Sequence, residues 1–168
     1  TRRSSDLRDM IEKGKLRGIS LEPEYGRNYP EKELAAQIIG YVGTDNTGLN
    51  GIEYTYEDQL SPEPQTDENE EVYGNQIFLT IDLNIQYITE SIARKAYEEH
   101  QADTVMLLVM DATTGDILGY ASHPTFDPNV YNLYSTDSRQ NRPINYAYEP
   151  GSVFKIFSLA SFMDLDGI

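Results

Sequence analysis

The chain has 168 residues, no cysteine, and 28 acidic against 13 basic side chains, for a formal net charge of −15. A surface this acidic repels phosphate backbones and excludes nucleic-acid binding. The absence of cysteine excludes disulfides and thiolate metal sites. The two histidines, His100 and His123, lack ligand spacing, so we expect no metal and no cofactor.

The ends of the chain suggest a fragment of a longer protein. It begins at Thr1, without a methionine, and stops at Ile168, just past an apolar helix. The longest unbroken apolar run covers residues 105–110, which is too short to cross a bilayer. Any membrane anchor would therefore have to lie upstream of Thr1.

The first 60 residues predict short helices joined by turns. Ser4 or Ser5 can cap a first helix, and residues 33–39 favour a second. The glycine-rich stretch 43–51 predicts a chain of tight turns, after which Asn50 or Gly51 starts a helix.

Residues 61–75 are rich in proline, polar and acidic side chains, which is typical of a linker between domains. We therefore place a domain boundary here, between residues 1–75 and residues 76–168. The alternative is a charged loop inside one domain.

The second part alternates strands and helices. Residues 76–81 predict a strand, and Asp82 is placed to cap a helix over 83–100. A buried strand over 104–110, a turn, and a second strand over 116–122 complete a predicted hairpin. Residues 129–147 show no periodicity and predict a loop. The order of elements is that of an α/β or α+β domain.

Ser152 and Lys155 lie three residues apart where the loop turns into an apolar helix. Residues at i and i+3 share one face of a helix. A helix N-terminus favours negative charge on a serine oxygen, and a lysine among apolar neighbours can act as the base that activates it. The pattern suggests acyl transfer, with Ser152 in the first turn of a buried helix. Taken alone, it fits a helix-capping serine and a surface lysine better.

The wider motif changes this interpretation. The heptapeptide Glu-Pro-Gly-Ser-Val-Phe-Lys at residues 149–155 resembles the active-site motif of class B penicillin-binding proteins, the transpeptidases that cross-link bacterial peptidoglycan. Other stretches of the chain, between about residues 19 and 160, also resemble this family and occur in the family's sequence order. The Asn141-Arg142 pair matches the family's lead-in to the motif, and the sequence assigns it no chemistry.

The resemblance implies roles for individual residues. Ser152 would attack the penultimate D-Ala of a stem peptide, Lys155 would be the general base, and the Ser152 N–H would form half of the oxyanion hole. Penicillins would trap the same serine. The family's Ser-x-Asn and Lys-Thr/Ser-Gly elements do not occur after Lys155. We therefore expect this polypeptide by itself to be inactive.

The resemblance also implies an α+β fold, in which a small irregular pedestal domain precedes the N-terminal part of a penicillin-binding α/β sandwich. Its landmarks have a structural role, with Arg27 and Glu53 either forming an ion pair or leaving Glu53 solvated. The landmarks are Arg27, Gly48, Gly51, Glu53, Asp82 and Gly151.

The family implies a location on the outer side of the bacterial cytoplasmic membrane, with peptidoglycan stem peptides and β-lactams as ligands. An alternative function is a non-catalytic module, in which residues 1–75 dock membrane proteins of cell-wall assembly. A β-lactam-hydrolysing or β-lactam-sensing relative is a third possibility, which the pedestal landmarks disfavour.

Overall fold

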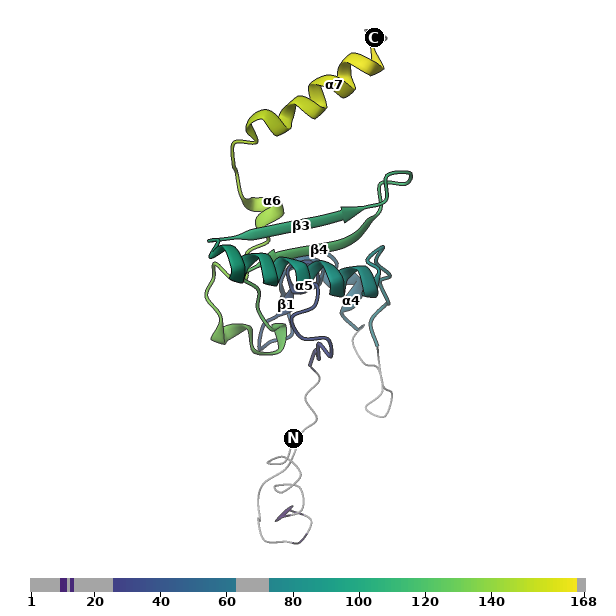
Figure 1. Cartoon of the computed structure of the whole chain (residues 1–168). Coiled ribbons are helices and arrows are strands. Elements are labelled where there is room, and N and C mark those ends of the chain that lie inside the picture. The colour runs from purple at the N-terminus through teal and green to yellow at the C-terminus, as the bar shows by residue number, and fades with distance from the viewer. Residues whose placement is uncertain (1–9, 12, 14–25, 63–72, 166–168) are drawn as a thin grey trace.

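The computed structural model describes residues 10, 11, 13, 26–62 and 73–165. Most of the predicted helix after Ser4 or Ser5 and most of the predicted linker lie outside these ranges, although Met10 and Ile11 of that helix are helical. The described residues form a body, made of residues 26–62 and 73–145, and an arm, residues 151–165. Figure 1 shows the arm standing away from the body at the C-terminal end.

The N-terminal segment, residues 26–62, is built from very short elements. Helix α2 (Ala36–Ile39) precedes strand β1 (Tyr41–Val42), which pairs antiparallel with β2 (Gly48–Asn50). Helices α3 (Gly51–Thr55) and α4 (Glu57–Leu60) follow.

The start of α3 agrees with the sequence, because the Asn50 side chain accepts a hydrogen bond from the N–H of Gly51 and caps the helix. The turns predicted before it are only partly correct. Residues 48–50 pair with β1, so the turn itself is confined to residues 43–47.

The predicted strand over residues 76–81 is wrong. These residues are extended but pair with no strand, and Phe78 and Leu79 are exposed. Asn75 bonds to the Gln59 carbonyl and Thr80 to the Ile117 carbonyl, which holds the segment only at its ends. Alternating β-forming residues predict an extended backbone, whereas a strand also requires a neighbour with a free edge.

Helix α5 (Leu83–His100) packs against an antiparallel hairpin of β3 (Val105–Met110) and β4 (Ile117–His123). The carboxylate of Asp82 accepts from the N–H groups of Asn84 and Ile85, as predicted for an N-cap. The hairpin itself is also confirmed. Strand β3 is not buried, however, and its last three residues, Leu108, Val109 and Met110, are exposed.

The outer edge of β4 is closed by groups that belong to no strand. The buried Gln86 amide accepts from the Tyr120 N–H and donates to the Tyr120 carbonyl, both at 2.7 Å. Gln37 donates to the Ser122 carbonyl, and the Asp82 N–H donates to the Leu118 carbonyl. Side chains and loop backbone therefore satisfy the groups that a further strand would otherwise pair.

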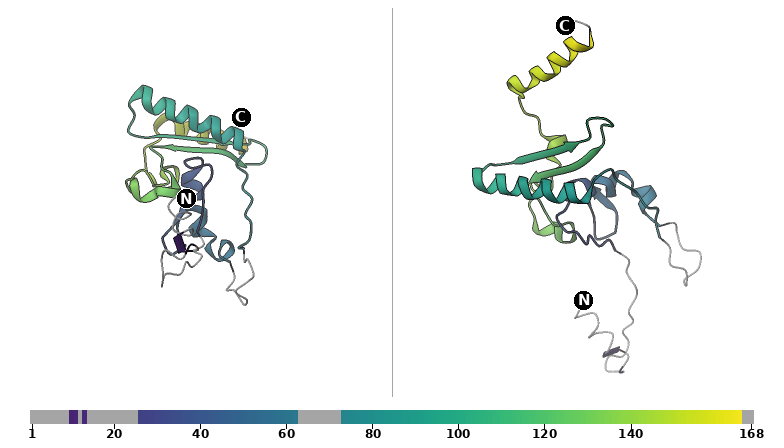
Figure 2. Two further views of the ribbon diagram at one scale, coloured as in Figure 1. Left: turned by 90° about the horizontal axis from the view of Figure 1, so that it is seen from below. Right: turned by 45° about the vertical axis from the view of Figure 1, so that its right-hand side comes forward.

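The core lies where the N-terminal segment meets the loop after β4. Phe126 is fully buried against Ala36 and Tyr41, and Tyr131 stacks on Tyr41 with ring centroids 4.3 Å apart. The predicted loop over 129–147 contains two short helices, η1 (Pro128–Leu133) and α6 (Arg142–Asn145). The two views of Figure 2 agree that η1 and the N-terminal segment lie on the same side of the hairpin.

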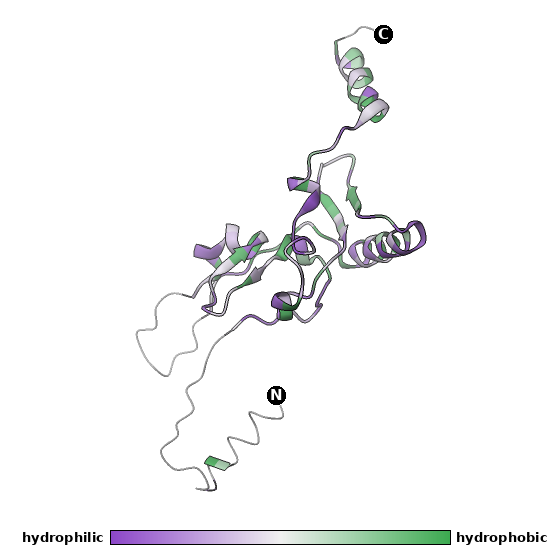
Figure 3. Cartoon of the chain, turned by 90° about the vertical axis from the view of Figure 1, so that its left-hand side faces the viewer, coloured by the Kyte–Doolittle hydropathy of each residue, from purple (hydrophilic) through white to green (hydrophobic). Residues whose placement is uncertain are grey.

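The arm is a 3₁₀ turn, η2 (Gly151–Phe154), continued by helix α7 (Lys155–Asp164). The helix forms where it was predicted, but the prediction that it is buried is wrong, since every residue from Gly151 to Leu165 is exposed. Figure 3 shows the apolar positions of this helix with no other element beside them. An apolar helix requires a complementary surface, and the described residues do not provide one.

Candidate active site

The turn at Gly151 sets the position of Ser152. Gly151 has a φ of +57°, in the left-handed region, and a Cβ placed there would meet nothing within 4 Å. The glycine is therefore required for backbone conformation rather than for space. Ser152 follows in the first turn of the helical arm, where N–H groups have no intrahelical partner. The first-turn position is the one predicted, whereas the roles of Ser152 as nucleophile and oxyanion donor stay predictions.

Lys155 begins α7 one turn after Ser152, so the two side chains lie on consecutive turns. Both are exposed, and among the described residues no hydrogen bond or ion pair joins them. The apolar neighbours expected to enclose Lys155 are open to solvent, with Phe154 56% and Ile156 67% exposed. The expectation that Lys155 is half-buried is therefore not met in this structure.

The landmark residues of the N-terminal segment form one network. The Arg27 guanidinium pairs with the carboxylate of the buried Glu53 at 3.2 Å, and the Tyr29 hydroxyl donates to the other oxygen of Glu53. Of the two alternatives for Glu53, the ion pair is the one observed. Burial, and then the negative charge of Glu53, raise the pKa of the Tyr29 hydroxyl well above its usual value. Tyr29 therefore remains a neutral donor.

Two of the landmark glycines are required by close packing. A Cβ on Gly51 would lie 2.5 Å from the Ile38 carbonyl oxygen, and the residue has a φ of +61°. A Cβ on Gly48 would lie 2.1 Å from the Glu53 carbonyl oxygen. Both distances are too short for any side chain, which explains the glycines in structural terms.

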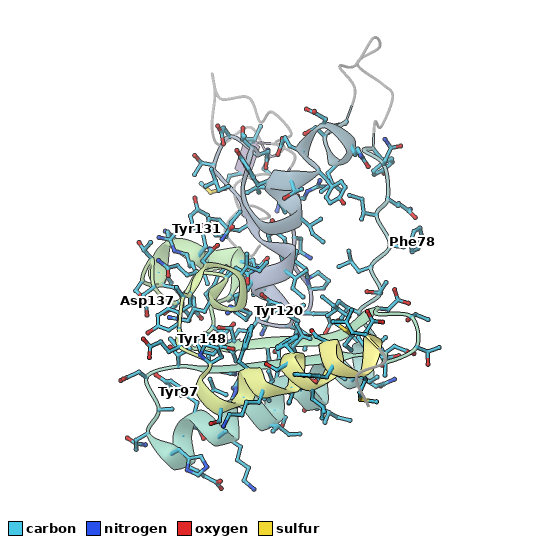
Figure 4. All side chains as sticks on the ribbon, turned by 90° about the horizontal axis from the view of Figure 1, so that it is seen from above. Phe78, Tyr97, Tyr120, Tyr131, Asp137 and Tyr148 are labelled. Carbon is cyan, nitrogen blue, oxygen red and sulfur yellow. The ribbon has the colours of Figure 1, made fainter. Side chains whose placement is uncertain are left out.

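The lead-in segment, residues 139–145, is tightly held, which the sequence did not predict. Arg142 is 2% exposed and donates to the Pro124 carbonyl and to Asp137. Asn141 accepts from the Tyr120 hydroxyl and donates to the Gln37 carbonyl. Figure 4 shows Tyr120 at the junction of the hairpin and the N-terminal segment. The family resemblance marked Asn141 and Arg142 without indicating these contacts.

Two hollows in the surface of the described residues have walls that do not include Ser152. One, of about 420 Å³, has mainly charged walls that include Glu33, Glu90 and Arg94. The other, of about 430 Å³, has largely apolar walls that include Ile52 and Phe78. Burial raises the pKa of Glu90, whose carboxylate accepts from the Ala35 N–H.

The described residues give no indication of a metal site or a membrane span. Within residues 26–62 and 73–165, no group of three or more His, Asp or Glu side chains could hold a metal ion. None of the helices described in the structure is long and apolar enough to cross a bilayer.

Comparison with known proteins agrees with these features. Residues 5–82 match the family described as penicillin-binding protein dimerisation domain, and residues 105–166 match the penicillin-binding protein transpeptidase domain. The probable peptidoglycan D,D-transpeptidase FtsI of Caulobacter vibrioides is 35% identical over 95% of this chain and 26% of its own length. The corresponding PenA of Neisseria gonorrhoeae is 32% identical over 89% of this chain and 29% of its own.

Solved structures give the same result. Penicillin-binding protein 3 of Mycobacterium tuberculosis matches with a TM-score of 0.72 and 30% identity, over 81% of this chain and 31% of that protein. The same protein has been solved with aztreonam and with ampicillin. The chain thus spans less than a third of these relatives. By sequence, by fold and by the order of its motifs, the chain belongs to the class B penicillin-binding proteins.

Proposed function

We propose that the protein carrying this chain is a peptidoglycan D,D-transpeptidase that works through an acyl-enzyme on Ser152. The observation that supports this most directly is the placement of Ser152 in the first turn of a helix, with Lys155 one turn later. Free N–H groups at this position favour the negative charge that develops as the serine oxygen attacks a carbonyl.

The reaction proceeds in two acyl transfers. The Ser152 hydroxyl attacks the carbonyl of the penultimate D-Ala while Lys155 takes its proton, and the terminal D-Ala leaves with a proton on its amine. An amine from a neighbouring stem peptide then attacks the ester, forms the cross-link and frees Ser152. The N–H of Ser152 donates to the oxyanion in both steps. A β-lactam acylates the same oxygen through opening of its ring.

The exposed arm indicates what else this chemistry needs. A lysine in bulk water keeps its proton at neutral pH and is a poor base, so Lys155 must be enclosed to act. The sequence contains neither a Ser-x-Asn triplet nor a Lys-Thr-Gly or Lys-Ser-Gly triplet. We infer that this polypeptide by itself neither transpeptidates nor reacts efficiently with penicillin, and that the full-length protein does both.

Labelling with a fluorescent penicillin tests both inferences. The full-length protein is expected to label at a single site, and Ser152→Ala is expected to abolish the signal. Ser158→Ala, an exposed serine on the same helix, serves as the matched control and keeps full labelling. Lys155→Ala should slow acylation at least about 100-fold. Labelling that survives in Ser152→Ala rules out the assignment, and strong Ser152-dependent labelling of the isolated 168-residue chain rules out its inactivity.

The proposed domain organisation is a pedestal over residues 1–75 and the start of the transpeptidase domain over residues 76–168. From the family we infer a location at the cytoplasmic membrane, with these domains on the outer side. Limited proteolysis of the full-length protein tests the boundary, since cleavage should concentrate in residues 61–75. Preferential cleavage inside residues 76–104 would move the boundary.

A second function, docking of membrane proteins of cell-wall assembly, is favoured by the apolar hollow between the N-terminal segment and residues 75–79. Its walls include Ile52, Leu60 and Phe78, of which Phe78 is 88% exposed. Copurification with such proteins should persist in Ser152→Ala and weaken in Phe78→Asp. Equal recovery with both variants would show that this hollow is not the docking surface.

A further inference from the structure

The lead-in segment is the last part of the chain fixed to the body before Ser152. Its helix α6 ends at Asn145, and residues 146–150 are exposed. Within the described structure, residues 147–150 make no hydrogen bond to another element. Seven Cα–Cα steps lead from Asn145 to Ser152, so these two Cα atoms can lie at most about 25 Å apart. The place where α6 is held therefore limits where Ser152 can be.

Asn141 connects the lead-in segment to two other parts of the molecule. Its side-chain oxygen accepts from the hydroxyl of Tyr120 on β4, and its amide donates at 3.3 Å to the carbonyl of Gln37 in α2. Its backbone carbonyl accepts from Ile144 and Asn145 and so starts α6. A single residue thus joins the N-terminal segment, the hairpin and α6. We call residues 146–151, which lead from α6 to Ser152, the tether.

Arg142 holds the same helix from a second direction. Its guanidinium, 2% exposed, donates at 3.2 Å to the Pro124 carbonyl and at 2.6 Å to the Asp137 carboxylate. Without these partners the buried guanidinium charge of Arg142 would be uncompensated, so breaking the contacts is costly. Arg139 adds a hydrogen bond to the Tyr41 hydroxyl.

We propose that Asn141 and Arg142 are positioning residues for Ser152, which tie the place of the nucleophile to the N-terminal segment. This rests on the proposed acyl transfer. If both anchors are lost, the nearest fixed residue is Arg139, which donates to the Tyr41 hydroxyl and whose carbonyl accepts from Asn50. The tether then lengthens from 7 to 13 Cα–Cα steps. Because the local concentration of a tethered group falls roughly as the −3/2 power of tether length, Ser152 would reach its working position about 2.5-fold less often.

A purely structural role predicts a different result. A residue that only stabilises the fold lowers the melting temperature and the amount of active protein, whereas the acylation rate of the folded molecules stays the same. A positioning residue lowers the limiting rate of acylation but leaves the β-lactam concentration at half-maximal rate unchanged. The two quantities separate in a time course measured over a range of fluorescent penicillin concentrations.

The test compares full-length Asn141→Ala/Arg142→Gln, Tyr120→Phe and wild type. The double variant is expected to lower the limiting rate about 2.5-fold, and Tyr120→Phe to lower it by less. Arg94→Gln, which removes an exposed Arg–Glu33 ion pair away from the lead-in segment, should change neither quantity. If the double variant does not fold, Tyr120→Phe decides. Unchanged limiting rates in the folded variants overturn the positioning role, whereas a wild type that never acylates overturns the proposed function instead.

Discussion

Helices α5 and α7 differ in a way that their composition does not predict. Helix α7 is the more apolar of the two, yet all its residues are exposed. Helix α5 carries many charged residues, yet it buries Gln86, Thr89 and Ala93 against the hairpin. The comparison shows that a helix is buried only where another element offers a complementary surface. In the body, the contacts between elements come largely from polar side chains with satisfied hydrogen bonds.

The largest expected difference in stability is between the loss of a core aromatic residue in the body and the loss of an exposed one in the arm. Phe126→Ala should lower the unfolding free energy by about 3–5 kcal/mol, because it leaves a cavity in the core. Phe157→Ala should change it by less than about 0.5 kcal/mol, because Phe157 is 64% exposed. Urea unfolding of the 168-residue chain measures both. Equal losses would mean that α7 is covered in solution.

A smaller effect is expected when the polar support of the hairpin is removed. Gln86→Leu should destabilise the chain by about 2 kcal/mol, since both backbone groups of Tyr120 lose their partner. Gln76→Leu, at an exposed position, serves as the control and should lie within about 0.5 kcal/mol of wild type. Amide exchange of Tyr120 should accelerate only in Gln86→Leu. Protection that is retained there would show that another group closes the β4 edge.

The network of the N-terminal segment should respond next. Glu53→Gln removes the negative charge that pairs with Arg27 and accepts a hydrogen bond from Tyr29. It should lower the unfolding free energy by about 1–2 kcal/mol. The exposed ion pair of Arg94 with Glu33 gives the comparison, and Arg94→Gln should lower stability by under about 1 kcal/mol. Thermal melts of both variants at low and high salt measure the two effects. A larger loss for Arg94→Gln would reverse their order.

The smallest effect concerns pH. Burial, and then the charge of Arg94, lower the pKa of His123 below its ordinary value of 6.5. Between the lowered pKa of His123 in the folded chain and its ordinary pKa in the unfolded chain, the unfolded chain binds more protons. The part of the unfolding free energy that comes from His123 is therefore lost as the pH falls below about 6.5. His123→Gln should flatten the drop in melting temperature between pH 7 and pH 5, whereas the exposed His100→Gln should not. If the drop in melting temperature is the same in His123→Gln as in wild type, other titratable groups cause it.

Local signals predicted the elements that depend on local chemistry. Asp82 caps α5, Asn50 caps α3, and the hairpin turns at residues 111–115, because each needs only neighbouring backbone groups. The failures concern partners that are distant in sequence. Residues 76–81 extend but find no strand, and α7 finds no covering surface. Periodicity indicates the shape of a segment but not its neighbour.

The candidate site shows the same division. The position of Ser152 at the start of a helix could be predicted from Pro150, Gly151 and the apolar run. The exposure of Lys155 could not, because the apolar run around it does not indicate whether another element covers the helix. Most contacts of Asn141 and Arg142 could not be predicted either, because all but the Arg142–Asp137 pair join residues 18 to 104 positions apart. Family resemblance marked these residues, and only the structure shows their contacts.

The closed edge of β4 determines how the sheet can grow. Since the Gln86 amide occupies both backbone groups of Tyr120, no incoming strand can pair there without first displacing a buried side chain. Strand β3 has no charged residue between Val105 and Met110 and carries no such cover in the described structure. Extension of this sheet is therefore one-directional, and any strand that joins it, whether during folding or in aggregation, must add beside β3.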